Sequence, residues 1–334
     1  MARMARFTPF IALALLPPAC GGSGLEPDPS PAGSLEAPEA PEVIVRFYDT
    51  GRTKRLEQGV LERGLRVGPW VSWHENGAKR SEGRYRDDLP EGEWRGWHAN
   101  GKPHYEGGFV RGVKQGRWRF WHEGGALFTE GSFEDDLDSG EWTSFYPSGA
   151  KLDEGRYAAG KQEGPWTSWH ENGAMRSQGS YRAGREHGPW TSWHENGQKG
   201  SEGSFEDGVR AGAWTSWHPN GAMSEAGSYA DGKPHGLWLK WYEDSSPMVS
   251  GEHEHGVPHG SWTRWLEGAG KLDEGRYVNG QREGLWRVWH PNGQLASEGT
   301  LAAGAMDGSW QFWTDDGAPD LERSGTYRAG VRVD

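Results

Sequence analysis

The tetrapeptide Trp-His-Glu-Asn begins at Trp73, Trp169 and Trp193, and it sets a histidine beside a carboxylate. That pair of residue types serves in general base catalysis and in metal binding. In an extended chain, however, adjacent side chains point to opposite faces, and copies two strands apart lie about 10 Å from each other, too far to share one ion. The sequence contains a recurring pattern in which a histidine directly follows a tryptophan. This histidine occurs seven times: His74, His98, His122, His170, His194, His218 and His290. The pattern therefore favours a structural role, with each histidine capping the end of a strand.

A second group of histidines, His253, His255 and His259, is the one local departure that could bind a metal ion. These three would converge only if the loop that carries His255 were distorted. The same segment has also lost the Asn-Gly turn of its neighbours, because Asp244 and Ser245 stand there. We therefore favour decay of the pattern, and predict no metal site and no cofactor.

Other catalytic signatures are missing from the sequence. No phosphate-binding loop, nucleophile elbow, HExxH motif or paired-carboxylate motif occurs, so the protein is predicted not to be an enzyme. The formal net charge of −12 disfavours nucleic acid as a partner. A single cysteine, Cys20, excludes an internal disulfide framework and a cysteine-rich zinc site.

The feature that explains most residues is a strict 24-residue period, which starts at Gly68 and runs through eleven copies to Gly308. The second residue after each starting glycine is tryptophan in all eleven copies, and the fifth is tryptophan in ten, with Phe145 as the exception. Together these positions account for all 21 tryptophans. A fixed period of this length indicates one supersecondary unit stacked on its neighbours.

Each unit contains two short aromatic or Thr/Ser segments and two glycine-containing turns, which predicts a β-hairpin. We predict three-residue loops at both turns, because two-residue loops would force positive φ at Ala159, Ala183 and Ala303. The predicted fold is all-β: an elongated, single-layer antiparallel meander of eleven to twelve hairpin repeats.

The predicted register sets Trp73 opposite Lys79. Alternation then puts Trp73, Gly83 and Tyr85 on one face, and Trp70, His74 and Glu82 on the other. The aromatic columns either pack the sheet or also bind a ligand. The candidate binding face consists of Trp73, Trp97, Trp121, Trp169, Trp193, Trp217, Tyr85 and Tyr181.

The amino terminus is predicted to be a targeting segment. Residues 1–19 combine two arginines, an apolar run of ten residues and a Pro-Pro-Ala end directly before Cys20, as in a bacterial lipoprotein signal peptide. Residues 20–42 comprise the lipidated cysteine and a linker rich in Pro, Gly and Glu. A degenerate first repeat is predicted at 43–67, and the eleven regular repeats at 68–334.

The pattern GpWxsWHeNGxxxSEGxYxxGxxxG resembles the MORN-repeat variant family of bacteria, over about residues 43–332. The resemblance implies an antiparallel repeat sheet used for protein or membrane contacts. Some members of that family are YwqK-like antitoxins that neutralise a partner toxin.

From these features we predict a non-catalytic, monomeric scaffold of the bacterial cell envelope, anchored by lipid at Cys20 and sorted to the outer membrane of a Gram-negative cell. Its partner is predicted to be an envelope protein. Two alternatives remain open: a carbohydrate- or peptidoglycan-binding envelope protein, and an antitoxin or immunity-like protein.

The lipid anchor can be tested with Cys20→Ser. Without the thiol no lipid can be attached, so the variant is expected to move from the membrane fraction to the soluble fraction on centrifugation. Unchanged partitioning of the variant between the two fractions would contradict the anchor.

Overall fold

The computed structural model describes residues 40–334, and the predicted signal peptide, Cys20 and most of the linker lie outside these residues. Within that range every regular element is a strand, and all of them join one open antiparallel sheet. No helix in the described range has the length and hydropathy needed to cross a bilayer. The predicted all-β meander is confirmed.

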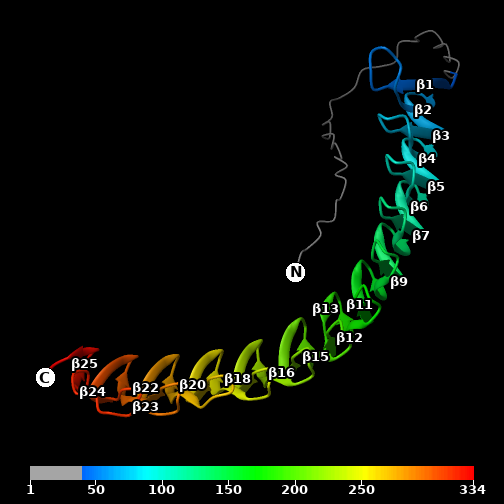
Figure 1. Cartoon of the computed structure of the whole chain (residues 1–334). Coiled ribbons are helices and arrows are strands. Elements are labelled where there is room, and N and C mark those ends of the chain that lie inside the picture. The colour runs from blue at the N-terminus through cyan, green and yellow to red at the C-terminus, as the bar shows by residue number, and fades with distance from the viewer. Residues whose placement is uncertain (1–39) are drawn as a thin grey trace, which may run out of the picture. The chain divides into compact units, whose positions relative to one another are not determined.

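The strands pair in the order of the sequence, as Figure 1 shows from β1 in blue to β25 in red. Their bounds are β1 Glu42–Phe47, β2 Arg55–Glu62, β3 Leu65–Trp73, β4 Lys79–Arg86, β5 Leu89–Trp97, β6 Pro103–Val110, β7 Val113–Trp121, β8 Leu127–Glu134, β9 Leu137–Phe145, β10 Lys151–Ala158, β11 Lys161–Trp169, β12 Met175–Arg182, β13 Arg185–Glu186, β14 Gly188–Trp193, β15 Lys199–Glu206, β16 Val209–Trp217, β17 Met223–Ala230, β18 Lys233–Trp241, β19 Pro247–Glu254, β20 Val257–Trp265, β21 Lys271–Val278, β22 Gln281–Trp289, β23 Leu295–Ala302, β24 Ala305–Phe312, β25 Gly325–Arg328 and β26 Val331–Arg332.

The first turn of each repeat has the predicted three-residue loop. His74 N–H donates to the Ala78 carbonyl at 2.8 Å, and Gly77 N–H donates to the His74 carbonyl at 2.9 Å. Gly77 has a φ of 85°, which glycine adopts without strain. Trp73 lies opposite Lys79, so this part of the predicted register is confirmed.

The second turn differs from the prediction. Ala158 pairs directly with Lys161, and the two residues between them, Ala159 and Gly160, have φ values of 48° and 75°. This is the two-residue turn with positive φ at both positions, whose twist matches that of the flanking strands. Ala183 and Ala303 take the same conformation, so the alanines adopt the left-handed region that the sequence argument had rejected.

A bulge in each long strand makes this short turn compatible with the sheet. The pairing shifts between Gly155 and Arg156, and opposite them the starting glycine of the repeat, Gly164, has a φ of 71°. Gly155 pairs with Trp166 and Arg156 with Glu163, so two residues of β11, Gly164 and Pro165, have no partner in β10, and regular pairing resumes beyond them. The predicted three-residue loop at this turn is wrong because the prediction assumed strands without bulges.

The sheet has two distinct faces. One face carries Trp70, Ser72, Gly83 and Tyr85 with their equivalents, as the direct pairs Trp70 with Gly83 and Ser72 with Ser81 show; we call it the ladder face. The other carries Trp73, Lys79 and Glu82 with their equivalents, and we call it the charged face. The predicted grouping of Gly83 and Tyr85 with Trp73 is wrong. A register shift next to Trp73 moves the rest of β4 by one residue, which exchanges its two faces.

On the ladder face each indole lies on a glycine of the preceding strand. A Cβ added at any of these glycines would come within 2.1–2.3 Å of the indole, so no other residue fits. The pairs are Gly59 with Trp70, Gly83 with Trp94, Gly107 with Trp118, Gly131 with Trp142, Gly155 with Trp166, Gly179 with Trp190, Gly203 with Trp214, Gly227 with Trp238, Gly251 with Trp262, Gly275 with Trp286 and Gly299 with Trp310. Nine of these indoles are only 2–8% exposed, although no second layer covers them within the described residues.

Ten of these eleven indoles are also fixed by a hydrogen bond. Trp94 Nε1 donates to the carbonyl of Arg84, the residue after its glycine, at 3.1 Å, and nine further indoles repeat the bond at 2.8–3.2 Å. Trp70 is the exception, because its Nε1 is buried without an acceptor in residues 40–334.

Between successive indoles stands a second ring, which meets both edge to face. From Trp70 through Tyr85 and Trp94 to Trp286, successive ring centroids lie 5.0–6.3 Å apart. Such contacts add about 0.5–1.5 kcal/mol each beyond the area they bury. Near the carboxyl end Leu301 replaces the ring, and it clusters with Trp286, Trp310 and Phe312.

The contact between indole and glycine can be tested with Gly131→Ala. The new methyl group would lie 2.1 Å from Trp142, so we expect a loss of about 1–3 kcal/mol in the free energy of unfolding, measured by urea denaturation. Gly124→Ala is the matched control, because a Cβ there meets nothing within 4 Å. Equal stability of the two variants would contradict this account of the fold.

Candidate functional site

The histidines of the Trp-His-Glu-Asn pattern join neighbouring repeats. His74 Nε2 donates to the main-chain carbonyl of Trp97 at 2.8 Å, and all seven histidines of this column make the equivalent bond at 2.8–3.1 Å. The hydroxyls of Tyr146 and Tyr242 make the same bond at 3.0 and 2.9 Å. The predicted structural role is confirmed, with the difference that each histidine binds the strand end of the following repeat.

The asparagines of the first turn reinforce this link. Asn76 Oδ1 accepts from Ala78 N–H at 3.0 Å within its own loop, and its Nδ2 donates to the Ala99 carbonyl of the next loop at 2.7 Å. The loop edge of the sheet is thus tied from repeat to repeat by side chains, which leaves these residues occupied within the fold.

On the charged face a half-buried column of aromatic residues runs beside the charges, with Trp73, Trp97, Trp121, Trp169, Trp193 and Trp217 among its members. Lys79 Nζ lies 5.0 Å from the ring centre of Trp97, in the next repeat, and Lys151, Lys199 and Lys271 repeat this contact at 4.9–5.5 Å. Lys79 is also ion-paired with Glu82 at 2.7 Å. The lysines therefore cover the ring of the following repeat while remaining at the surface.

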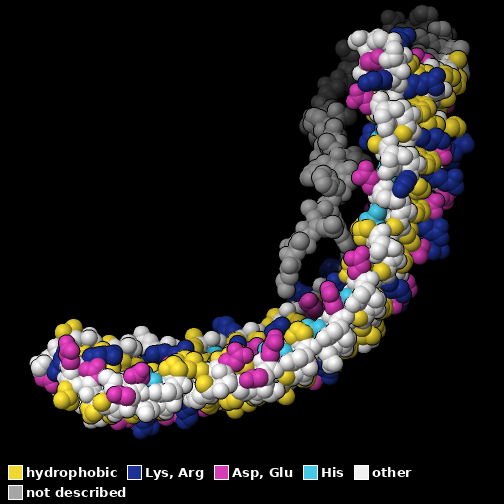
Figure 2. Space-filling view, in the orientation of Figure 1, with side chains coloured by type: hydrophobic (Ala, Val, Ile, Leu, Met, Phe, Trp, Pro, Cys, Tyr) yellow, Lys and Arg dark blue, Asp and Glu magenta, His cyan; other side chains and the backbone are white. Residues whose placement is uncertain are grey.

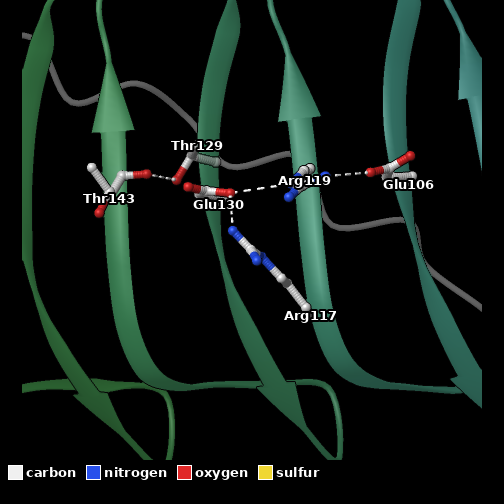
Figure 3. Close-up of polar contacts among 6 residues, drawn as sticks. All are labelled: Glu106, Arg117, Arg119, Thr129, Glu130 and Thr143. Atoms are coloured by element: carbon white, nitrogen blue, oxygen red, sulfur yellow. Dashed lines mark hydrogen bonds and ion pairs between the residues drawn. The ribbon is translucent and has the colours of Figure 1, made fainter.

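Carboxylates and guanidinium groups alternate across neighbouring strands of this face, as Figure 3 shows. Arg119 binds Glu106 at 3.1 Å and Glu130 at 3.2 Å, and Arg117 binds Glu130 at 2.7 Å. The hydrogen bond from Arg117 is the main reason that the pKa of Glu130 lies below its usual value. Glu130 therefore stays ionised, and it is unsuited to donate a proton near neutral pH.

Tyr85 and Tyr181, the other two members of the predicted binding face, lie on the ladder face. Tyr181 stands between Trp166 and Trp190, with ring centroids 5.9 and 5.2 Å away, and burial raises its pKa to about 12. These tyrosines do not share a surface with the Trp73 column. The prediction of one common face is wrong for the same reason as the predicted alternation.

The structure also separates the second histidine group. His253 stands in the aromatic ladder between Trp238 and Trp262, at 6.1 and 5.0 Å. His255 occupies a turn, with a φ of 50°, and His259 Nδ1 lies 3.5 Å from Glu254. In residues 40–334 no group of three His, Cys, Asp or Glu side chains is placed to hold a metal ion.

One site that sequence reasoning missed lies on the ladder face between β2 and β6. Three repeats have a pair of serines there, and in the first of these pairs the oxygens of Ser72 and Ser81 are 2.6 Å apart. Gly96 and Tyr105 replace that pair in the next repeat, and the Tyr105 ring lies against the bare Gly96 backbone. Beside them is a hollow of about 710 Å³. The available signal was the tyrosine at a position otherwise held mainly by small or polar residues.

Taken together, these features define an all-β repeat protein, a single open sheet in which each hairpin binds the next. Residues 90–110, 162–183, 186–207 and 282–302 match the family described as MORN repeat variant. The four matching segments identify MORN-variant repeats within the chain, and such repeats suggest a scaffold for protein or membrane contacts.

No curated protein matches the chain. Among solved structures, the chain is similar to TcdB2-TccC3-Cdc42, with 9% identity over 85% of this chain and 16% of that one, and a TM-score of 0.17. It is also similar to the Photorhabdus luminescens Tc holotoxin pore, with 10% identity over 87% of this chain and 17% of that one, and the same TM-score. The chain spans less than a fifth of these proteins, and such scores carry no functional argument.

The ring of His253 makes stability depend on pH. Partial burial and nearby Lys240 lower its pKa below 6.5, and its Nδ1 is buried without a partner in the described part of the chain. Since the unfolded chain binds the proton more readily, stability is present above pH 6.5 and falls as the pH drops toward the folded pKa. We expect faster amide exchange in β18–β20 at pH 5.5 than at pH 7.5, after correction for intrinsic rates.

His253→Tyr is the control, because tyrosine occupies the equivalent ladder position at Tyr85 and Tyr229. It should remove this additional pH dependence. The same pH dependence in both proteins would show that His253 is not its source.

Proposed function

We propose that the protein is a non-catalytic, lipid-anchored repeat scaffold of the bacterial cell envelope, which binds a protein partner along its charged face. In this proposal Cys20 carries the lipid, and residues 21–42 link it to the sheet. The protein acts as a monomer at the outer membrane, without a cofactor and without nucleic acid.

The observation that carries the proposal is the regular composition of the charged face. The half-buried rings of the Trp73 column repeat every second strand, about 10 Å apart, with lysines, arginines and glutamates between them. Aromatic and arginine side chains are enriched where proteins bind one another. Figure 2 shows acidic and basic side chains interspersed along the strands, which suits a protein surface with both signs of charge better than a membrane of one sign.

The bonding of the histidines supports a role without catalysis. The Nε2 atoms of His74, His170 and His194 donate to main-chain carbonyls of the following repeat, so each ring has a role within the sheet. At the equivalent position the hydroxyl of Tyr146 donates to the Trp169 carbonyl. A tyrosine can replace the histidine there because the role of the side chain is to join two repeats.

Photo-cross-linking can test which face meets a partner. We would place a photoreactive residue at Thr191, on the charged face, or at the adjacent Ser192, on the ladder face, and irradiate intact cells. Thr191 is expected to give protein adducts of discrete mass in the membrane fraction, and Ser192 few or none. Equal adducts from both positions, or none of protein mass from Thr191, would contradict the proposed binding face.

A further inference from the structure

The hollow beside Gly96 and Tyr105 has the form of a small-molecule site. Its floor is the row Glu57, Ser72, Ser81 and Gly96, which are direct cross-strand partners, and Glu57 is ion-paired with Arg46 at 2.5 Å. Tyr105 closes the row on one side, and Trp70, Tyr85 and Trp94 of the ladder stand along it. Its volume, about 710 Å³, lies in the range of ligand pockets.

A flat aromatic surface adjoins this floor. Tyr105 is inclined by only 25° to Trp118, and Phe120 by only 19° to the same indole, with centroids 6.1 and 5.7 Å away. A second hollow of about 290 Å³ lies over these rings and shares Tyr85, Trp94 and Tyr105 with the first. Trp310 and Phe312 are stacked in a similar way, at 26°, but a run of three near-parallel rings occurs among the described residues only at β6–β7.

Hydrogen-bonding groups surround the rings. Of the two hydroxyls of Ser72 and Ser81, one donates to the other, which leaves one proton and several lone pairs for a ligand. His104 lies at the rim, with its ring 4.3 Å from that of His98. Burial, together with His98 and His74, lowers the pKa of His104, which keeps an uncharged imidazole at the rim at neutral pH.

Three charged side chains line the hollow, and two of them are ion-paired within the fold, Glu57 with Arg46 and Arg66 with Asp88. Arg80 lines it, and no carboxylate of residues 40–334 is ion-paired with Arg80. The equivalent residue Arg176, by contrast, donates to Ser168 within the fold. An arginine of this kind can bind a carboxylate through two parallel hydrogen bonds.

From this geometry we propose that the hollow binds an acidic saccharide. The C–H face of a sugar ring packs on Tyr105, its hydroxyls meet Ser72, Ser81 and His104, and its carboxylate pairs with Arg80. Aromatic faces carry partial negative charge, which favours contact with polarised C–H groups. This site goes beyond the proposed protein scaffold and does not depend on it, since the two use opposite faces of the sheet.

The test is calorimetric titration of the full-length protein with a galacturonic acid trimer, and with the neutral trimer maltotriose as the reference sugar. The acidic trimer is expected to bind, and the neutral one at least about 10-fold more weakly. Arg80→Gln should weaken binding of the acidic trimer by about 10-fold, whereas Arg176→Gln, the matched control, should change it by less than about 2-fold.

The double change Gly96→Ser with Tyr105→Ser restores the serine pair found at Ser192 and Ser201, so it should fold, as circular dichroism can verify. It is expected to abolish binding of the acidic trimer. No binding by the unaltered protein, equal binding of both trimers, or unchanged binding by the double variant would each overturn the proposal. None of these results would bear on cross-linking through Thr191.

Discussion

The whole sheet depends on the contact between an indole and the bare backbone of a glycine. Because Gly83 has no side chain, Trp94 can lie flat on the preceding strand and reach the carbonyl of Arg84. The bulge beside that glycine opens the carbonyl, and the tyrosines and phenylalanines close the gaps between the indoles. A single layer can thus bury its tryptophans without a second layer, which accounts for a composition rich in Gly and Trp and poor in aliphatic residues.

The fold class can be predicted from the repeating residues of the sequence. Structural details that depend on β-bulges cannot be predicted in this way. The 24-residue period and the Asn-Gly turns are enough to predict hairpins and the pairing of Trp73 with Lys79. The two-residue turn at Ala159 and the assignment of Tyr85 to a face require knowledge of two bulges. A bulge has only a weak sequence signal, and a shift of one residue exchanges every later side chain between the two faces.

The candidate site illustrates a related limit. A residue that recurs in most repeats, such as the histidine after Trp73, is accounted for by bonds between repeats. Residues that depart from the repeat pattern are therefore better indicators of a binding site, but not every such residue changes the surface. His253 keeps its place in the ladder, whereas Tyr105 with Gly96 reshapes the surface. Sequence alone cannot distinguish the two cases, because the difference lies in which neighbouring side chain is absent.

The bonds from each repeat to the next have a consequence for how such a protein can change in length. His170 donates to the Trp193 carbonyl as His194 donates to the Trp217 carbonyl, so the junctions between these interior repeats are nearly the same. Deleting or duplicating 24 codons in register would leave matching partners on both sides of the cut. Each event would move the two ends of the sheet by about 10 Å. Recombination between the repeats of one gene would therefore change the length of the sheet in fixed steps of one repeat.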